Sequence, residues 1–200
     1  MKRLGFALLF LAIAWSTYKS WLHRKYEQTP GMLVAEEPGQ DDLGSSGPQF
    51  THGDYAIKAV AGYRVRARLL GRESYSHGRE SDLSPLDFAL GWGPMSDSAV
   101  LAQMQLSQSA RFFMLHWPTK EPPLPSDVIF DHAANTHLIP ADSTVLDALD
   151  RMRPGQVIEL QGYLVNVSAR DGWQWHSSLT RGDRGAGACE LMWVERAQVN

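Results

Sequence analysis

The C-terminal part of this chain constrains its fold more than any other feature. Residues 156–167 read QVIELQGYLVNV, a run typical of a long β-strand, in which Gly162 indicates a kink or a bulge. The pair Asp171-Gly172 is typical of a hairpin turn, because Asp-Gly tolerates positive φ. Residues 173–180 would return as a strand, and residues 188–195 would form the last one. This end of the chain therefore predicts β-structure with a hairpin.

A second strand is predicted where apolar residues alternate strictly with arginines, over residues 63–69. The exposed face of this strand would carry Arg64, Arg66 and Arg68, about 7 Å apart along the strand. We expect these arginines to pair with acidic residues of neighbouring strands. The alternative is a ligand-binding strip for anions or lipid headgroups.

Two short helices and a further strand complete the predicted elements. A helix could begin at Ser96 or Asp97 and run to about Ser107, and another could run from Asp142 or Ser143 through Met152. The apolar run 111–117 predicts a strand. The fold class is therefore β-rich α+β: a small, partly open β-barrel or an antiparallel sheet with two short helices. A long strand kinked at glycine and followed by a hairpin is compatible with a barrel like the oligonucleotide/oligosaccharide-binding (OB) fold.

The N-terminal segment predicts a membrane anchor. Residues 4–22 are mostly apolar, come after a tail of residues 1–3, and have basic residues on both sides. A helix that spans a bilayer needs about 20 such residues. Alternatives are a cleaved signal peptide, with Ala12-Ile13-Ala14 as its cleavage site, and a buried helix of the globular fold. The short, positively charged tail favours a single-pass topology with the globular domain outside the cytoplasm.

The domain organisation follows from composition. Residues 23–50 are rich in Pro, Gly, Ser and acidic residues, which predicts a flexible linker. Residues 51–200 would form a single β-rich globular domain, large enough to bury a core without disulfides. Cys189 is the only cysteine, so an intramolecular disulfide is excluded.

Charge and residue spacing limit the partners that we expect. The net charge of −3 offers no excess of cations for a phosphate backbone, so we expect no nucleic-acid partner. His132 and His137 are five residues apart, a spacing that fits neither a helical nor a strand metal pair, so we expect no metal and no cofactor. The expected partners are the lipid bilayer, through residues 4–22, and an unidentified protein or component of the cell envelope.

The candidate site lies in the polar segment 173–190. Trp173 and Trp175 share a strand face and would either stack on a ligand or belong to the core. Cys189 could be a nucleophile with a histidine as its base, but an isolated cysteine in a strand is usually a small buried residue. No nucleophile-elbow motif surrounds Ser178. If the chain were catalytic, the candidate residues would be His137, Ser178, Arg181, Asp183, Cys189 and Glu190.

Three functional hypotheses remain, one of which is a small barrel that binds anionic ligands along Arg64, Arg66 and Arg68. The sequence favours a membrane-anchored interaction or structural module without catalysis, because it contains no strong catalytic motif. The alternative is a membrane-anchored hydrolase that acts on cell-envelope material. That alternative predicts that His137, Arg181, Asp183 and Glu190 converge on one cleft.

Overall fold

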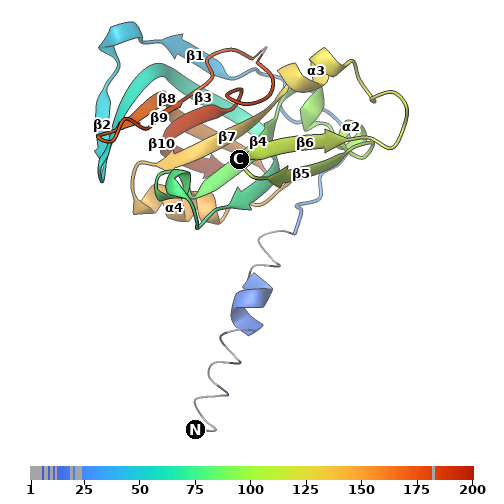
Figure 1. Cartoon of the computed structure of the whole chain (residues 1–200). Coiled ribbons are helices and arrows are strands. Elements are labelled where there is room, and N and C mark those ends of the chain that lie inside the picture. Colours follow the sequence, from blue (N-terminus) through green and yellow to red (C-terminus); the bar gives the residue numbers. More distant parts are fainter. Residues whose placement is uncertain are drawn as a thin grey trace.

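The computed structural model describes residues 24–181 and 183–200, together with residues 6, 9, 11, 13–18 and 20 of the N-terminal segment. These residues form a β-rich α+β fold with a mixed eight-stranded sheet, a separate two-stranded hairpin and a few short helices (Figure 1). The strands are β1 (Gly39–Asp42), β2 (Gln49–His52), β3 (Tyr55–Ser74), β4 (Leu86–Gly91), β5 (Gln105–Ser109), β6 (Phe112–His116), β7 (Ala133–Pro140), β8 (Val157–Ala169), β9 (Gln174–His176) and β10 (Glu190–Val199). The α-helices are α2 (Ser98–Leu101), α3 (Ser126–Asp131) and α4 (Ser143–Asp150), and the 3-10 turns are η1 (Gly44–Ser46), η2 (Arg79–Asp82) and η3 (Gly93–Ser96).

Five strands pair in a closed cycle, which we call the five-stranded ring. β3 pairs antiparallel with β4, and β4 pairs antiparallel with β7. β10 lies parallel to β7 and antiparallel to β8, and β8 pairs back to β3. The β7–β10 pair makes the sheet mixed, whereas the sequence predicted an antiparallel sheet as one alternative. A parallel pair needs a long crossover, which α4, β8 and β9 supply here.

β3 is the strand that the arginine alternation predicted, and the alternation sets its two faces. Tyr63, Val65 and Ala67 are buried in the ring, whereas Arg64 and Arg66 are exposed. The strand pairs with β8 along its first part and with β4 along its last part. Its register shifts at two points along its length, which allows so long a strand to follow the curve of the ring.

The bulge predicted at Gly162 is present, but the extra residue lies in the partner strand. The register of β10 against β8 shifts between Val194 and Arg196, opposite Gly162. A Cβ atom at Gly162 would collide with the carbonyl oxygen of Trp193. Glycine is therefore required here because the two backbones approach each other closely.

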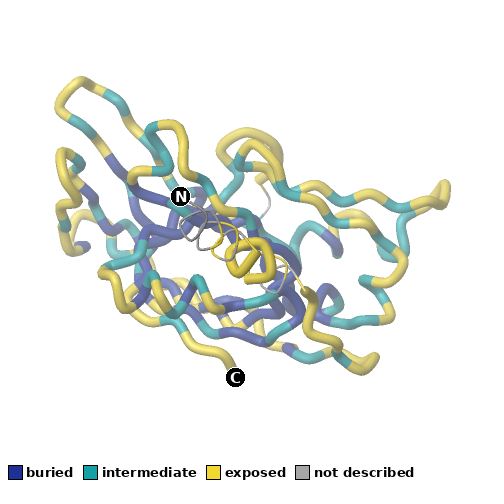
Figure 2. The backbone as a smooth tube through the Cα atoms, turned by 90° about the horizontal axis from the view of Figure 1, so that it is seen from below, coloured by how far each residue is buried: buried dark blue, intermediate teal, exposed yellow. Residues whose placement is uncertain are grey.

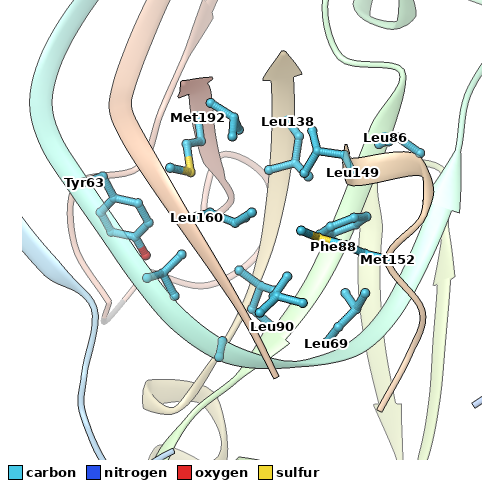
Figure 3. Packing of buried hydrophobic residues seen from close by; sticks show 14 of the residues in the cluster. Tyr63, Leu69, Leu86, Phe88, Leu90, Leu138, Leu149, Met152, Leu160 and Met192 are labelled. Atoms are coloured by element: carbon cyan, nitrogen blue, oxygen red, sulfur yellow. The ribbon is translucent and has the colours of Figure 1, made fainter. Parts of the chain in front are cut away.

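The core fills the ring, and α4 closes one end of it. Figure 3 shows Phe88, Leu90, Leu138 and Leu160 meeting inside the ring, and Leu149 of α4 packs against the same cluster. α4 is the second predicted helix, and its cap is Asp142, whose side chain accepts a hydrogen bond from the backbone N–H of Val145. Figure 2 shows that the buried segments form the wall of the ring, while the loops are exposed.

The first predicted helix was wrong in its length. α2 begins after the Asp97 cap, as expected, but ends at Leu101. The segment that would have continued the helix is β5, which pairs with β6 in the hairpin. The turn between these strands holds Ala110 and Arg111 at positive φ. The strand expected over 111–117 is present as β6.

The interval 24–50 differs from the flexible linker that its composition predicted. β1 and β2 both pair with β3, and Val34 is buried in the core. The backbone N–H of Tyr26 donates to the carbonyl of Pro154 at 2.6 Å. Polar composition was misleading because β1 and β2 are joined to the fold by backbone hydrogen bonds more than by apolar side chains.

The predicted anchor, residues 4–22, lies partly outside the described residues. Where the structure describes this segment, residues 13–18 are helical and stand apart from the body (Figure 1), and Leu9, Leu11 and Ile13 are exposed. Among the described residues, no helix combines the length and the apolar character needed to cross a bilayer.

Candidate functional site

A pocket of about 190 Å³ opens at the end of the ring where β7 begins, whereas α4 follows the end of β7. We call it the ring-end pocket. One of its walls is aromatic, and the other is polar. The aromatic wall comprises Trp92, Phe112, Phe113 and Phe130, and the polar wall includes Asp131, Asn135, Arg181, Asp183, Arg184, Cys189 and Glu190.

Glu190 is the buried carboxyl group of this pocket. It is the first residue of β10 and alternates with Met192 and Val194, which belong to the core inside the ring. Its side chain is 7% exposed, and no described residue donates a hydrogen bond to its Oε2 atom. Burial raises the pKa of Glu190 to about 7, and the charge of Asp183 adds to this effect. Its own backbone N–H and the charge of Arg181 act in the opposite direction.

Other polar atoms around Glu190 are also buried. Thr136 is the register partner of Glu190 on β7, and neither Thr136 Oγ1 nor Trp92 Nε1 has a hydrogen-bond partner among the described residues. Burial, and then the charge of Glu190, raises the pKa of Tyr63, while Arg181 opposes that rise. Buried polar groups without partners are uncommon in folded proteins, and ligand sites are among the places where they occur.

Two arginines of the loop that precedes β10 lie on the aromatic wall. The guanidinium carbon of Arg181 lies 5.3 Å from the centre of the Trp92 ring, and its Nη2 donates to the carbonyl of Pro38 at 2.9 Å. Arg184 lies 5.0 Å from the centre of the Phe130 ring and forms an ion pair with Asp131 at 2.9 Å. Both guanidinium groups therefore make cation–π contacts with aromatic rings that line the pocket.

Asp183 is the ionised carboxylate of the pocket. It accepts hydrogen bonds from the hydroxyls of Thr180 and Ser178, the latter at 2.7 Å. These hydroxyls lower the pKa of Asp183. The Ser178 hydroxyl donates its single proton to Asp183, with the carbonyl of Thr180 as an alternative acceptor at 3.0 Å, and it accepts from the backbone N–H of Thr180, so it is held in the loop.

Cys189 carries a protonated thiol. Burial raises its pKa to about 11. Asn135 Nδ2 donates to the sulfur at 3.7 Å, and the thiol lies 3.9 Å from the carbonyl of Arg111. A thiol with a raised pKa is a weak nucleophile at neutral pH, because the thiolate is the reactive form.

A second polar group, which we call the Asp87 cluster, lies on the outer face of the ring. Asp87 of β4 and His137 of β7 are register partners, and Nδ1 of His137 lies 3.0 Å from Oδ2 of Asp87. Arg111, in the turn of the β5–β6 hairpin, donates to Oδ1 of the same carboxylate at 2.7 Å. Since Asp87 is fully buried, these two partners are the natural compensation for its charge.

The two tryptophans of the polar segment lie near this cluster. The ring of Trp175 is 5.0 Å from that of His137, and Trp173 packs beside Trp175 at 6.1 Å. The guanidinium of Arg79 covers Trp173 at 4.7 Å. Both indoles are half-buried and pack against the hydrophobic cluster on the outer face of the ring.

The arginine row of β3 makes contacts within the fold. Arg64 pairs with Glu159 of β8 at 2.6 Å, and Arg66 pairs with Glu36 at 3.5 Å. The expectation that Arg68 lies on the exposed face was wrong: it is buried at the end of the β8 pairing, where it donates to the carbonyl of Ser96 and the hydroxyl of Ser98.

The structure thus brings together only part of the set of residues that the hydrolase hypothesis named. Arg181, Asp183, Cys189 and Glu190 line the ring-end pocket, and Ser178 contacts Asp183, whereas His137 belongs to the Asp87 cluster. Sequence reasoning missed the aromatic wall, because Trp92, Phe113 and Phe130 come from separate segments that only the tertiary fold brings to the pocket of Glu190. Within the described part of the chain, no group of three or more His, Cys, Asp or Glu residues could hold a metal ion.

Comparison with known proteins gives no further guide, because no protein-family model, curated protein or solved structure matches this chain.

Proposed function

We propose that this protein is a membrane-tethered binding module without catalysis, and that its ligand or partner enters the ring-end pocket. One observation carries the proposal: the Glu190 carboxyl group is buried at the inner wall of an open pocket, and no described residue donates to its Oε2 atom. Burying such a group without a partner costs stability, and a ligand that supplies the missing hydrogen bond recovers part of that cost.

We further propose that the ring is a small barrel of the OB type. The strand order β3-β4-β7-β10-β8, the parallel β7–β10 pair and the placement of α4 between β7 and β8 support this assignment. In OB barrels, the loop between the fourth and fifth strands helps to bind ligands. Here that connection, residues 170–189, supplies Arg181 and Asp183 to the pocket. The fold type alone does not identify the ligand.

The tether is proposed from the apolar N-terminal segment, with the globular part outside the cytoplasm. Leu9, Leu11, Ile13 and Trp15 are more than half exposed, an arrangement that is costly in water and favourable in lipid. An unidentified protein or a component of the cell envelope would then meet the pocket.

A second candidate function is a membrane-anchored hydrolase of cell-envelope material. The observation in its favour is that the pocket contains two carboxyl groups with pKa values shifted in opposite directions, upward for Glu190 and downward for Asp183. Such a pair can supply a general acid and a general base. The protonated thiol of Cys189 and the fully engaged hydroxyl of Ser178 argue against a nucleophilic mechanism at either residue.

The proposal is tested with the full-length chain in detergent micelles. A library of small polar aromatic compounds is screened by NMR against the wild type, Ala188→Trp, which fills the pocket, and Gln174→Trp, which places the same indole on the exposed strand β9. We expect compounds to shift pocket resonances in the wild type and in Gln174→Trp, but not in Ala188→Trp.

The hydrolase is tested on the same preparations with a generic ester, a glycan and a phosphodiester. If the wild type hydrolyses one of these substrates and Glu190→Gln does not, the protein is a hydrolase and the proposal of a binding module without catalysis is wrong. Absence of both hydrolysis and binding in the pocket would contradict both functions.

A further inference from the structure

We propose that the ring-end pocket selects an organic cation: a primary ammonium group on a small aromatic or aliphatic body. The ammonium would contact Glu190, and the body would pack against the aromatic wall. This inference rests on the proposed binding function and specifies the chemical class of the ligand.

Hydrogen bonding at Glu190 favours a donor, whereas the N–H of Trp92, also unpaired among the described residues, needs an acceptor. Oε2 of Glu190 lacks a donor among the described residues, and the hydroxyl oxygen of Thr136, its register partner, is also unpaired within the described chain. An ammonium group donates three hydrogen bonds and accepts none, so it suits a carboxylate with a hydroxyl beside it.

The balance of charge favours a cation as well. Two arginines line the pocket, Arg181 and Arg184, against three acids, Asp131, Asp183 and Glu190. Arg184 is already paired with Asp131. With Glu190 ionised, the pocket carries one negative charge in excess, which a monovalent cation neutralises and an anion would double.

The aromatic wall is attractive to cations and has the right size. The guanidinium groups of Arg181 and Arg184 lie over the rings of Trp92 and Phe130, so these rings already accept positive charge from the protein itself. Phe113 extends the same wall. The volume of about 190 Å³ suits a body of benzyl size, since a cavity of about 150 Å³ holds benzene.

Cation binding is coupled to the release of a proton from Glu190. Its pKa of about 7 leaves this carboxyl about half protonated at neutral pH, and a bound ammonium favours the carboxylate. The groups that face it are Tyr63 from β3, Arg181 and Asp183 from the loop, and the neighbouring Cys189. The raised pKa values of Tyr63 and Cys189 keep both protonated, and the lowered pKa keeps Asp183 ionised, so Glu190 governs the pH dependence near neutrality.

The test compares three probes of one size on the full-length chain in detergent micelles: benzylammonium, benzyl alcohol and benzoate. Binding is followed by NMR and calorimetry in the wild type, in Glu190→Gln, and in Glu159→Gln, a matched control at a half-buried carboxylate of β8 that does not line the pocket. We expect benzylammonium to bind best, and roughly eightfold more tightly at about pH 7.5 than at about pH 6, as the ionised fraction of Glu190 rises. Glu190→Gln should weaken binding at least tenfold and remove its pH dependence, and Glu159→Gln should change neither.

The remaining outcomes separate this inference from the proposed function. If the wild type prefers benzoate, or if benzyl alcohol binds equally to the wild type and to Glu190→Gln, the proposed selectivity for a cation is wrong. The pocket would still be a binding site. If none of the three probes binds and no compound of the wider library binds, both the preference for a cation and the proposed binding function are wrong. If Glu190→Gln does not fold, the ranking of probes and the pH dependence in the wild type still decide the question.

Discussion

At the scale of single residues, the burial of the Glu190 carboxyl group is costly to the stability of the fold. An apolar residue at the first position of β10 would continue the inward-facing pattern of Met192 and Val194 at no electrostatic cost. The chain instead buries a carboxyl group, whose charged form is disfavoured there. A group kept at such a cost is a candidate for function.

This cost has a measurable pH signature. In the unfolded chain Glu190 ionises near 4.5, whereas in the folded protein it holds its proton until about pH 7. Its contribution to stability is therefore complete below pH 4.5 and declines as the pH rises to about 7, by roughly 3 kcal/mol in total. We expect urea unfolding of the wild type to show this decline and Glu190→Gln to lack it. Parallel curves for the two proteins across this range would contradict the burial of the charge.

Cys189 should be slow to react although it lines the same pocket. With its pKa raised to about 11, few of its thiols are ionised at pH 8. We expect alkylation by iodoacetamide, followed by mass spectrometry, to be at least about tenfold slower in the folded protein than in urea. Equal rates would mean that the thiol is activated, and would reopen its role as a nucleophile.

At the scale of elements, the β5–β6 hairpin is held to the ring by a buried ion pair, by hydrogen bonds to the side chain of Asn135, and by apolar packing of Leu106, Phe113 and Leu115. Arg111 reaches from the turn of the hairpin to Asp87 on β4, and also donates to the hydroxyl and the carbonyl of Ser84. Its guanidinium carbon lies 3.9 Å from the centre of the Tyr75 ring. The hairpin also carries Phe112 and Phe113, so this attachment positions part of the pocket wall.

Arg111→Met should therefore be far more damaging than the same change at an exposed arginine. It leaves the fully buried carboxylate of Asp87 without its guanidinium partner, and we expect the free energy of unfolding to fall by about 3–5 kcal/mol. Arg64→Met, which breaks an ion pair at a side chain that is 67% exposed, should cost less than about 1 kcal/mol. Comparable losses in urea unfolding would show that the Asp87 pair is not the hairpin's main attachment.

Sequence patterns predicted the elements in which the order of apolar and polar residues matches the order of buried and exposed side chains. The arginine alternation predicted the central part of β3, Asp142 predicted the start of α4, and Gly162 predicted the bulge. The patterns failed where backbone pairing decides the structure. β1 has no buried side chain, and the partly helical spacing of Val100, Leu101, Met104 and Leu106 concealed the start of β5.

The site was predictable only in part, for a related reason. Arg181, Asp183, Cys189 and Glu190 are close in sequence, so one polar segment identified them. Trp92 and Thr136 join them through strand register, which a single sequence does not specify. His137 was separated from the set because it faces outward from β7, whereas its neighbour Thr136 faces inward.

At the scale of the whole molecule, the segment that follows the apolar helix is short and bound to the body. Tyr26 is hydrogen-bonded to Pro154, and the Gln28 side chain donates to the carbonyl of Gly155 at 3.0 Å. Few residues therefore separate the helix from the globular part, and the distance between them is limited.

Anchoring itself is tested by changing the apolar helix. We expect the full-length protein to sediment with membranes and to be released by detergent. Leu9→Asp combined with Ile13→Asp should move it to the soluble fraction, because each buried Asp costs about 2.5–3.5 kcal/mol in the middle of a bilayer. Met32→Asp, at an exposed position of the body, should have no effect. Intact wild-type protein in the soluble fraction without detergent would exclude the anchor.

The attachment of Tyr26 and Gln28 beside Pro154 and Gly155 has a consequence for how far the body can lie from the apolar helix. If that helix stands in a bilayer, the few residues between it and Tyr26 keep the globular part close to the lipid surface, so a ligand or partner that reaches the pocket has to come within a short distance of the membrane.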